Sequence, residues 1–249
     1  MVRMATLPVS EPDKGQLPLE LGHVPAQGEG DFLVGEGNAL AHGRIFAFPH
    51  WPDPITLLIG PAKSGKSHLA RIFADRSGAR FAQPDQLEAM ATQGGQGPLV
   101  LEDVDRLAYD EAGLFHLLNQ SMRDGRPLLL TAREEVAQWT LATDDVRSRA
   151  RRATAYTLEL TDDIQLSQMF VKLFGDRQIA VDPKVIGYLV ARMERSAAEA
   201  VVLVELMDRL ALAKGTAITR SIAAEALDRQ MQARGETGRD QNQDGPDDE

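Results

Sequence analysis

The stretch GPAKSGKS, from Gly60 to Ser67, constrains the fold of this chain more than any other feature. It matches the phosphate-binding pattern G-x-x-x-x-G-K-[ST], follows the apolar run ITLLI directly and opens the helical pattern SHLARIFADRSG. This strand–loop–helix context distinguishes a phosphate-binding loop from a chance glycine-rich turn. Because such a loop needs a strand before it and a helix N-terminus facing the anion, the sequence predicts an α/β nucleotide-binding protein.

The loop residues have separate expected roles. Gly60 and Gly65 let the backbone turn its N–H groups toward phosphate oxygens. Lys66 is expected to reach the β- and γ-phosphates, and the Ser67 hydroxyl to ligate Mg²⁺. The expected cofactors are therefore ADP or ATP with Mg²⁺. The predicted nucleotide-binding residues of this stretch are Gly60, Pro61, Ala62, Lys63, Ser64, Gly65, Lys66, Ser67 and His68.

Apolar runs typical of strands alternate with helical patterns up to Leu160. Continuous apolar strands separated by helices indicate a parallel sheet covered on both faces. The fold class expected is α/β, a P-loop core with a five-stranded parallel sheet followed by a small all-helical lid domain. The expected strands are residues 55–60, 79–82, 98–103, 127–132 and 155–160.

Beyond Leu160 the sequence predicts helices only. They are expected over 162–175, 182–194, 196–215 and 219–232. Side chains that can accept a hydrogen bond from the first helical turn precede each of them. These N-cap candidates are Asp162, Asp182, Ser196 and Thr219, and Gly175 and Gly215 are the candidate helix ends.

The two ends of the chain differ in composition from this core. Residues 1–29 are rich in proline, glycine and charge, and residues 233–249 are acidic and free of large apolar side chains. Both compositions are typical of segments that bury too little apolar surface to fold. The expected organisation is a flexible arm (1–29), a nucleotide-binding αβ core (30–160), a helical lid (161–232) and a disordered tail (233–249).

Composition excludes several function classes. The chain has 249 residues, no cysteine and a net charge of −10, so it has no disulfide or thiolate metal site and is a poor general binder of phosphate backbones. No apolar run approaches the roughly 20 residues that span a bilayer, and the N-terminus lacks a signal-peptide core. A cytoplasmic protein that does not bind membranes is expected.

Polar side chains at two expected strand ends are candidates for metal binding and catalysis. Glu102 and Asp103 end the stretch LVLED, where α/β sheets bind ligands. Because side chains alternate along a strand, only one of the two faces the metal directly. If Glu102 does, Asp103 is free to orient a water; if Asp103 does, Val104 follows and no catalytic carboxylate remains. Thr131, at the end of LLLTA, is a candidate sensor of the γ-phosphate.

Four arginines gather in TDDVRSRARRATAY: Arg147, Arg149, Arg151 and Arg152. A solvated basic face is one interpretation. The other is an arginine finger, which in oligomeric P-loop ATPases stabilises the γ-phosphate charge in a neighbour's site. Composition does not decide between the two.

Together these stretches resemble the AAA+ ATPases of the bacterial replication-initiator branch, and within it the DnaA-related regulatory inactivators of the Hda type. The resemblance extends from Gln16 to Gln230. It rests on QLPLEL, DFLVGEGNALA, LLIGPAKSGKSHLA, LVLEDVDRL, LLLTA, VRSR and the four-helix lid.

The resemblance implies a negative regulator of replication initiation. Arg149 would be the finger acting on ATP held by DnaA, and Phe32 and Leu33 would line the adenine pocket. In the initiators a DNA-binding helix-turn-helix domain follows the lid, whereas here an acidic tail follows. A regulator without sequence-specific DNA binding is therefore expected, with homo-oligomerisation as a further expectation.

Two departures from the family bear on catalysis. The acidic strand end is Glu102-Asp103, where the initiators usually show two aspartates, and the lid position of their sensor-II arginine is Val201. Arg192 and Arg195 are out of register with it. We therefore expect a protein that holds a nucleotide and hydrolyses ATP weakly or not at all. A helicase loader or motor of the same superfamily, and a small-molecule P-loop kinase, are the alternatives.

The arm contains QLPLEL, Gln16 to Leu21, which has two interpretations. It folds back on the core, or it is a peptide ligand, because Pro18 favours an extended conformation at Leu17 and extended peptides bind grooves through a few apolar anchors. The stretch resembles the motif by which proteins dock on the β subunit of the DNA polymerase sliding clamp. The residues implied in clamp binding are Gln16, Leu17, Leu19 and Leu21.

Overall fold

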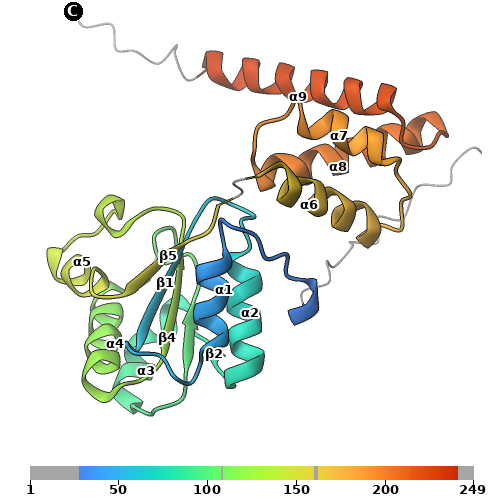
Figure 1. Cartoon of the computed structure of the whole chain (residues 1–249). Helices are drawn as coiled ribbons and strands as arrows, with labels where there is room; N and C mark the ends of the chain where they lie inside the picture. Colours follow the sequence, from blue (N-terminus) through green and yellow to red (C-terminus); the bar gives the residue numbers. More distant parts are fainter. Residues whose placement is uncertain (1–27, 108, 160–161, 241–249) are drawn as a thin grey trace, which may run out of the picture.

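The computed structural model describes residues 28–107, 109–159 and 162–240, and for 234–240 only the backbone. Figure 1 shows an α/β half that carries the sheet and a second half made of helices alone. The predicted clamp-binding residues Gln16, Leu17, Leu19 and Leu21 lie outside the described residues.

A five-stranded parallel sheet forms the centre of the first half. Its strand order is β2-β3-β4-β1-β5, and every neighbouring pair is parallel. This confirms the predicted fold class. All five strands are shorter than expected, and β3 ends before Glu102 and β5 before Leu158. The strands are β1 (Ile55–Ile59), β2 (Arg80–Phe81), β3 (Leu99–Leu101), β4 (Leu128–Ala132) and β5 (Thr154–Thr157).

Helices cover both faces of the sheet because its central strands are apolar on both sides. Leu58 and Leu129 pack on one face with α1 (Ala39–Phe46) and α2 (Lys66–Ser77). Leu57 and Leu130 belong to the core of the other face. That face is covered by α3 (Leu87–Gln93), α4 (Glu111–Asp124) and α5 (Asp144–Ala150), and the short 3₁₀ helices are Glu29–Asp31, Pro84–Gln86 and Val136–Gln138.

The second half packs around its own apolar core, with Phe170, Leu203 and Met207 fully buried. All four predicted N-cap side chains accept a backbone N–H from the first turn. Gly215 ends α8 in the left-handed region (φ 61°). The helices are α6 (Asp163–Asp176), α7 (Pro183–Val190), α8 (Ala197–Lys214) and α9 (Arg220–Asp240).

Two predicted boundaries differ from the structure. Gly175 does not end α6, which runs on to Asp176; the left-handed residue beyond it is Gln178 (φ 58°). The expected tail from residue 233 is helical as far as Asp240, because α9 continues through this segment although Gly235 and Gly238 disfavour helix. Within the described parts of the chain, no helix combines the length and the apolar character needed to cross a membrane.

Candidate nucleotide-binding site

The phosphate-binding loop joins β1 to α2, as predicted. A Cβ on Gly60 would lie 2.4 Å from the Leu158 carbonyl oxygen, so only glycine fits there. Lys63 (φ 65°) and Gly65 (φ 102°) both adopt the left-handed region, and α2 begins at the next residue. Alternation of this kind turns successive backbone N–H groups inward, and the helix N-terminus adds positive potential. The loop is therefore shaped to bind an anion.

Lys66 folds into this loop. Its Nζ donates to the carbonyl oxygens of Gly60 at 2.6 Å and Pro61 at 2.8 Å, and the residue is 6% exposed. Burial lowers the pKa of Lys66, and the charge of Asp103 opposes that shift. A buried cation of this kind gains most from a charged partner, and a phosphate group supplies one.

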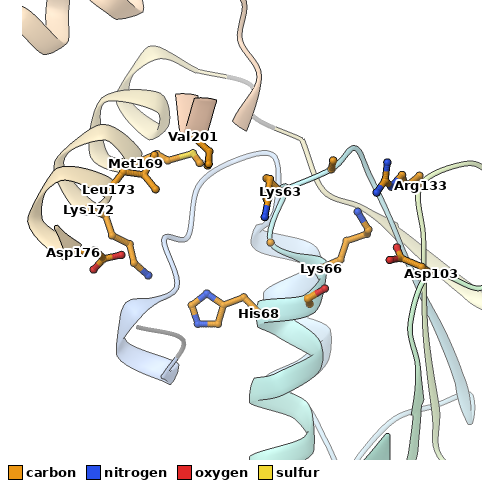
Figure 2. Close-up of a pocket in the computed structure, with 13 residues that line it drawn as sticks. Lys63, Lys66, His68, Asp103, Arg133, Met169, Lys172, Leu173, Asp176 and Val201 are labelled. Atoms are coloured by element: carbon orange, nitrogen blue, oxygen red, sulfur yellow. The ribbon is translucent and has the colours of Figure 1, made fainter. Parts of the chain in front are cut away.

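A cavity of 380 Å³ lies over the loop (Figure 2). One side is formed by the loop and the ends of the sheet strands, and the other by α6, with Val201 of α8. Both cationic and carboxylate side chains line this cavity. The lining residues are Ala62, Lys63, Gly65, Lys66, Ser67, His68, Asp103, Arg133, Met169, Lys172, Leu173, Asp176 and Val201.

Asp103 faces this cavity, while Glu102 is not among its lining residues. The alternation argument does not apply, because β3 ends at Leu101 and Asp103 takes a left-handed conformation (φ 47°). The Glu102 Oε1 atom is buried and has no hydrogen-bond partner among the described residues. Tyr109 donates to the Glu102 carbonyl oxygen at 2.6 Å, and burial raises the pKa of Tyr109 to about 12.

Ser67 and Asp103 line the same cavity and fit a Mg²⁺ ion bound together with phosphates. Mg²⁺ commonly takes one or two carboxylates and completes its shell with water and phosphate oxygens. Among the described residues, no cluster of three His, Cys, Asp or Glu side chains could hold a metal ion by itself.

The Thr131 hydroxyl is engaged in a hydrogen bond within the protein. Thr131 is 1% exposed, its Oγ1 accepts the Asp103 N–H at 2.9 Å, and it is not one of the cavity-lining residues. Arg133, two residues later, reaches the cavity instead. Asp105 holds that turn, because its Oδ2 accepts the N–H groups of Arg133 at 2.8 Å and Glu134 at 2.9 Å. Sequence reasoning missed Arg133, although its place just after an apolar strand was a usable signal.

A smaller cavity of 140 Å³ adjoins the loop on its other side. Phe32 and Leu33 line it, together with Lys63 and Gly65 of the loop. The Phe32 ring packs edge-on against His68, with centroids 5.3 Å apart. Asn38 fixes the backbone here, since its Nδ2 donates to the Leu33 carbonyl at 2.9 Å. The structure thus brings the predicted adenine-pocket residues to the phosphate-binding loop.

Val201 of the lid, the residue at the predicted sensor-II position, lines the larger cavity. Neither alternative arginine is in that cavity: the Arg192 guanidinium lies 4.1 Å from the Tyr188 ring centroid, and Arg195 pairs with Asp163 at 2.9 Å. The lid cation that does line the cavity is Lys172 of α6, which also donates to the Asp31 carbonyl at 2.7 Å. Lys172 was not predicted from the sequence, because only tertiary packing brings α6 to the loop.

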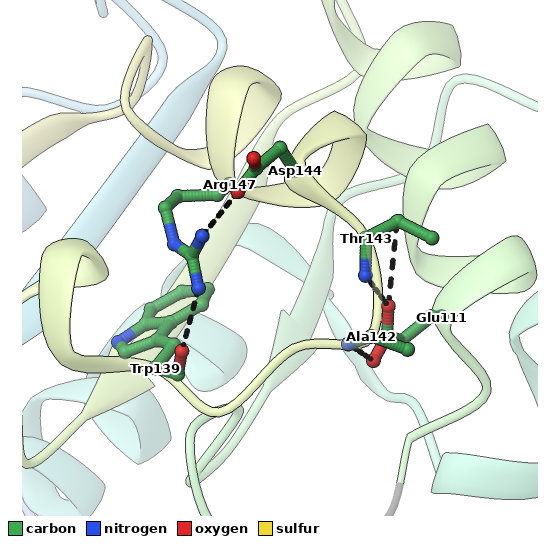
Figure 3. A network of polar contacts seen from close by, with 6 residues as sticks. All are labelled: Glu111, Trp139, Ala142, Thr143, Asp144 and Arg147. Atoms are coloured by element: carbon green, nitrogen blue, oxygen red, sulfur yellow. Dashed lines mark hydrogen bonds and ion pairs between the residues drawn. The ribbon is translucent and has the colours of Figure 1, made fainter.

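The arginine cluster lies on α5 and at its end, on the sheet face opposite to α2 (Figure 1). Figure 3 shows that Arg147 is engaged locally, with Asp144 and with the Trp139 carbonyl at 3.0 Å. Arg149 is half-buried and its guanidinium lies 5.8 Å from the Phe115 ring centroid. Within the described residues Arg149 forms no ion pair, and Arg149 lines neither cavity at the loop.

Replacing Arg133 with alanine is expected to weaken ATP binding about tenfold and ADP binding less, because a charged hydrogen bond to the terminal phosphate is worth about 1.5–3 kcal/mol. Isothermal titration with both nucleotides measures this. Arg106→Ala removes the same charge from an exposed position and should change neither affinity. Equal affinities of Arg133→Ala and the unaltered protein for ATP would contradict a phosphate contact.

Solved structures share this fold. Domain III of the Thermotoga maritima replication initiation protein DnaA has a TM-score of 0.68 at 14% identity, over 83% of this chain and 97% of that one. AMPPCP-bound DnaA from Aquifex aeolicus has a TM-score of 0.58 at 19% identity, over 82% and 68%. The Thermotoga maritima RuvB Holliday junction branch migration motor has 0.59 at 18% identity, over 78% and 69%.

No protein family model matches the sequence, and no curated protein sequence matches it. At these identities the likeness establishes the fold alone, an α/β core with a phosphate-binding loop followed by a helical domain.

Proposed function

We propose that this chain is a nucleotide-holding AAA+ regulator of chromosomal replication initiation, of the Hda type, which docks on the DNA polymerase sliding clamp and promotes hydrolysis of DnaA-bound ATP. The observation that carries the proposal is the position of Arg149. It lies on α5, on the face of the sheet opposite to α2, the helix that follows the phosphate-binding loop, and it lines neither cavity at that loop. An arginine outside its own nucleotide cavity is placed to act on a neighbour's nucleotide.

The chain's own site would hold ADP or ATP with Mg²⁺. Lys66 and the loop N–H groups would bind the phosphates, and Ser67 and Asp103 would hold the metal, which offsets phosphate charge when bound. The combined cavities have the residues for both ends of a nucleotide: cations over the loop, and Phe32 with Leu33 beside it. Glu102 and Thr131 would act indirectly, since neither lines the phosphate cavity.

We infer weak or absent intrinsic hydrolysis from the lid. Val201 brings no charge to the position where the initiators carry their sensor-II arginine, and Arg192 and Arg195 are bound elsewhere. Lys172 and Arg133 bring positive charge to the cavity, which favours tight nucleotide binding. The site would therefore keep the regulator folded around a nucleotide while DnaA supplies the ATP that is hydrolysed.

Arg149 suits the role of an arginine finger because α5 is held in place from both sides. The Glu111 carboxylate of α4 accepts the N–H groups of Ala142 at 2.7 Å and Thr143 at 3.2 Å (Figure 3). Arg147 fastens the same helix to the Trp139 carbonyl. These contacts fix the backbone that carries Arg149, so its side chain would extend toward a neighbour's phosphate from a defined position.

A hydrolysis assay with radioactive ATP tests the whole proposal. The chain alone should turn over little ATP, whereas DnaA-bound ATP should be hydrolysed faster when the chain and the clamp loaded on DNA are both present. Stimulation without the clamp would contradict clamp docking. Rapid turnover by the chain alone would favour a helicase loader or DNA motor, an alternative that the likeness to RuvB supports.

The N-terminal arm would bring the regulator to the replisome in the cytoplasm. Changing Gln16 and Leu17 together to alanine is expected to abolish capture of the chain on immobilised clamp, because the arm would lose its polar specifier and one apolar anchor. ADP affinity should stay the same. Leu7→Ala with Glu11→Ala, in the same arm, is the control that should leave capture intact. Capture of the Gln16 and Leu17 double variant at the unaltered level would remove the arm from the proposal.

A further inference from the structure

Two residues that line the smaller cavity beside the loop, Ser64 and Gln165, each have a buried polar atom without a partner among the described residues. Ser64 belongs to the phosphate-binding loop itself, whereas Gln165 comes from α6. Gln165, in the first turn of α6, is 4% exposed and lines this cavity. Its Oε1 atom is buried and accepts no hydrogen bond from any described residue. Buried polar groups are nearly always paired, so an orphan acceptor at a cavity wall is available to a donor from a ligand in that cavity.

The cavity is where the base of a bound nucleotide would lie. It shares Lys63, Gly65 and His68 with the larger phosphate-side cavity, so the two are continuous at the loop. Phe32 provides an aromatic wall. At 140 Å³, the space suits a single ring system rather than a whole nucleotide.

Gln165 is also held in position. Its backbone N–H donates to the Asp162 carboxylate at 2.5 Å, which caps α6. Gly35 lies against the side chain, since a Cβ there would be 2.1 Å from the Gln165 Nε2. The other amide side chain at this cavity, that of Asn38, is engaged at both ends: its Oδ1 accepts the Gly35 N–H at 2.9 Å and its Nδ2 donates to the Leu33 carbonyl. Gln165 is the amide at this cavity whose oxygen accepts no hydrogen bond from the described residues.

We propose that Gln165 selects adenine, with its Oε1 accepting a hydrogen bond from the 6-amino group of the base. This inference rests on the proposed binding of ADP or ATP and adds to it the residue that recognises the base. A purine with a 6-keto group presents an acceptor at that point, so two acceptors would face each other. A purine with hydrogen at position 6 leaves the Oε1 atom unpaired, which costs affinity.

The test compares three diphosphates by isothermal titration: ADP, purine riboside 5′-diphosphate, which lacks the 6-amino group, and inosine 5′-diphosphate, which has the keto group. The unaltered protein should bind ADP about tenfold more tightly than either analogue, as expected for one hydrogen bond to a buried acceptor. Gln165→Leu should bind all three diphosphates with affinities within a factor of about two, because the hydrogen bond to the 6-amino group is then absent.

Two further variants separate the amide from general damage to the cavity. Gly35→Ala keeps the amide but displaces it, and should also lose the preference for ADP. Gln168→Leu replaces an exposed glutamine on the same helix and should retain the preference for ADP. Melting temperatures without nucleotide establish that each variant is folded.

The outcomes distinguish adenine selection by Gln165 from the proposed nucleotide binding on which it rests. If the unaltered protein binds none of the diphosphates, the nucleotide site is refuted and base selection falls with it. If all three bind equally, or if inosine diphosphate equals ADP because the amide has turned over, nucleotide binding stands and adenine selection by Gln165 is refuted. Retention of the ADP preference in Gln165→Leu refutes it as well.

Discussion

Lys66→Ala is expected to lower ADP affinity about a hundredfold, since hydrogen bonds to charged groups are worth about 1.5–3 kcal/mol and this ammonium group would make more than one. Two effects combine in this loss. The phosphates lose their buried cation, and the carbonyl groups of Gly60 and Pro61, which Lys66 now satisfies, lose their donor and loosen the loop.

The measurement is isothermal titration with ADP, supported by thermal melting. ADP should raise the melting temperature of the unaltered protein and raise that of Lys66→Ala much less, because a ligand stabilises a protein only to the extent that it binds the folded state. Lys184→Ala, which removes an exposed lysine of the lid, should bind ADP normally. Normal ADP affinity in Lys66→Ala would remove the loop from nucleotide binding altogether.

The sequence predicted the parts of this site that local chemistry specifies. The spacing of Gly60, Gly65 and Lys66 predicted a loop between a buried strand and a helix, and the structure has that loop at those residues. The N-cap residues Asp162 and Ser196 were equally predictable, because an N-cap needs only a short polar side chain next to a helical pattern.

What the sequence left open depends on elements that meet only in the fold. Lys172 and Gln165 reach the nucleotide cavities because α6 packs beside the loop, more than ninety residues away in the chain. The choice between Glu102 and Asp103 assumed a strand that continues through both, whereas the backbone turns at Asp103. Thr131 was expected at the cavity, yet its hydroxyl is bound to the Asp103 N–H, and Arg133 lies there instead.

Arg149→Ala is expected to lower the stimulated rate of hydrolysis of DnaA-bound ATP about a thousandfold or more, the scale that an arginine finger contributes to phosphoryl transfer. Binding to the clamp and to ADP should not change, because Arg149 lines neither cavity at the loop and lies far along the chain from the arm. Arg149→Lys should recover little activity, since an ammonium group cannot make the planar, two-pronged contact of a guanidinium.

The neighbouring arginines supply the controls. Arg152→Ala removes an exposed charge from the same cluster and should leave stimulation nearly intact, which separates a specific finger from a general basic face. Arg147→Ala should reduce stimulation together with thermal stability, because Arg147 ties α5 to Trp139. If Arg149→Ala and Arg152→Ala lose the same modest amount, the cluster acts by its net charge alone, and the position of Arg149 on α5 has no special part in hydrolysis.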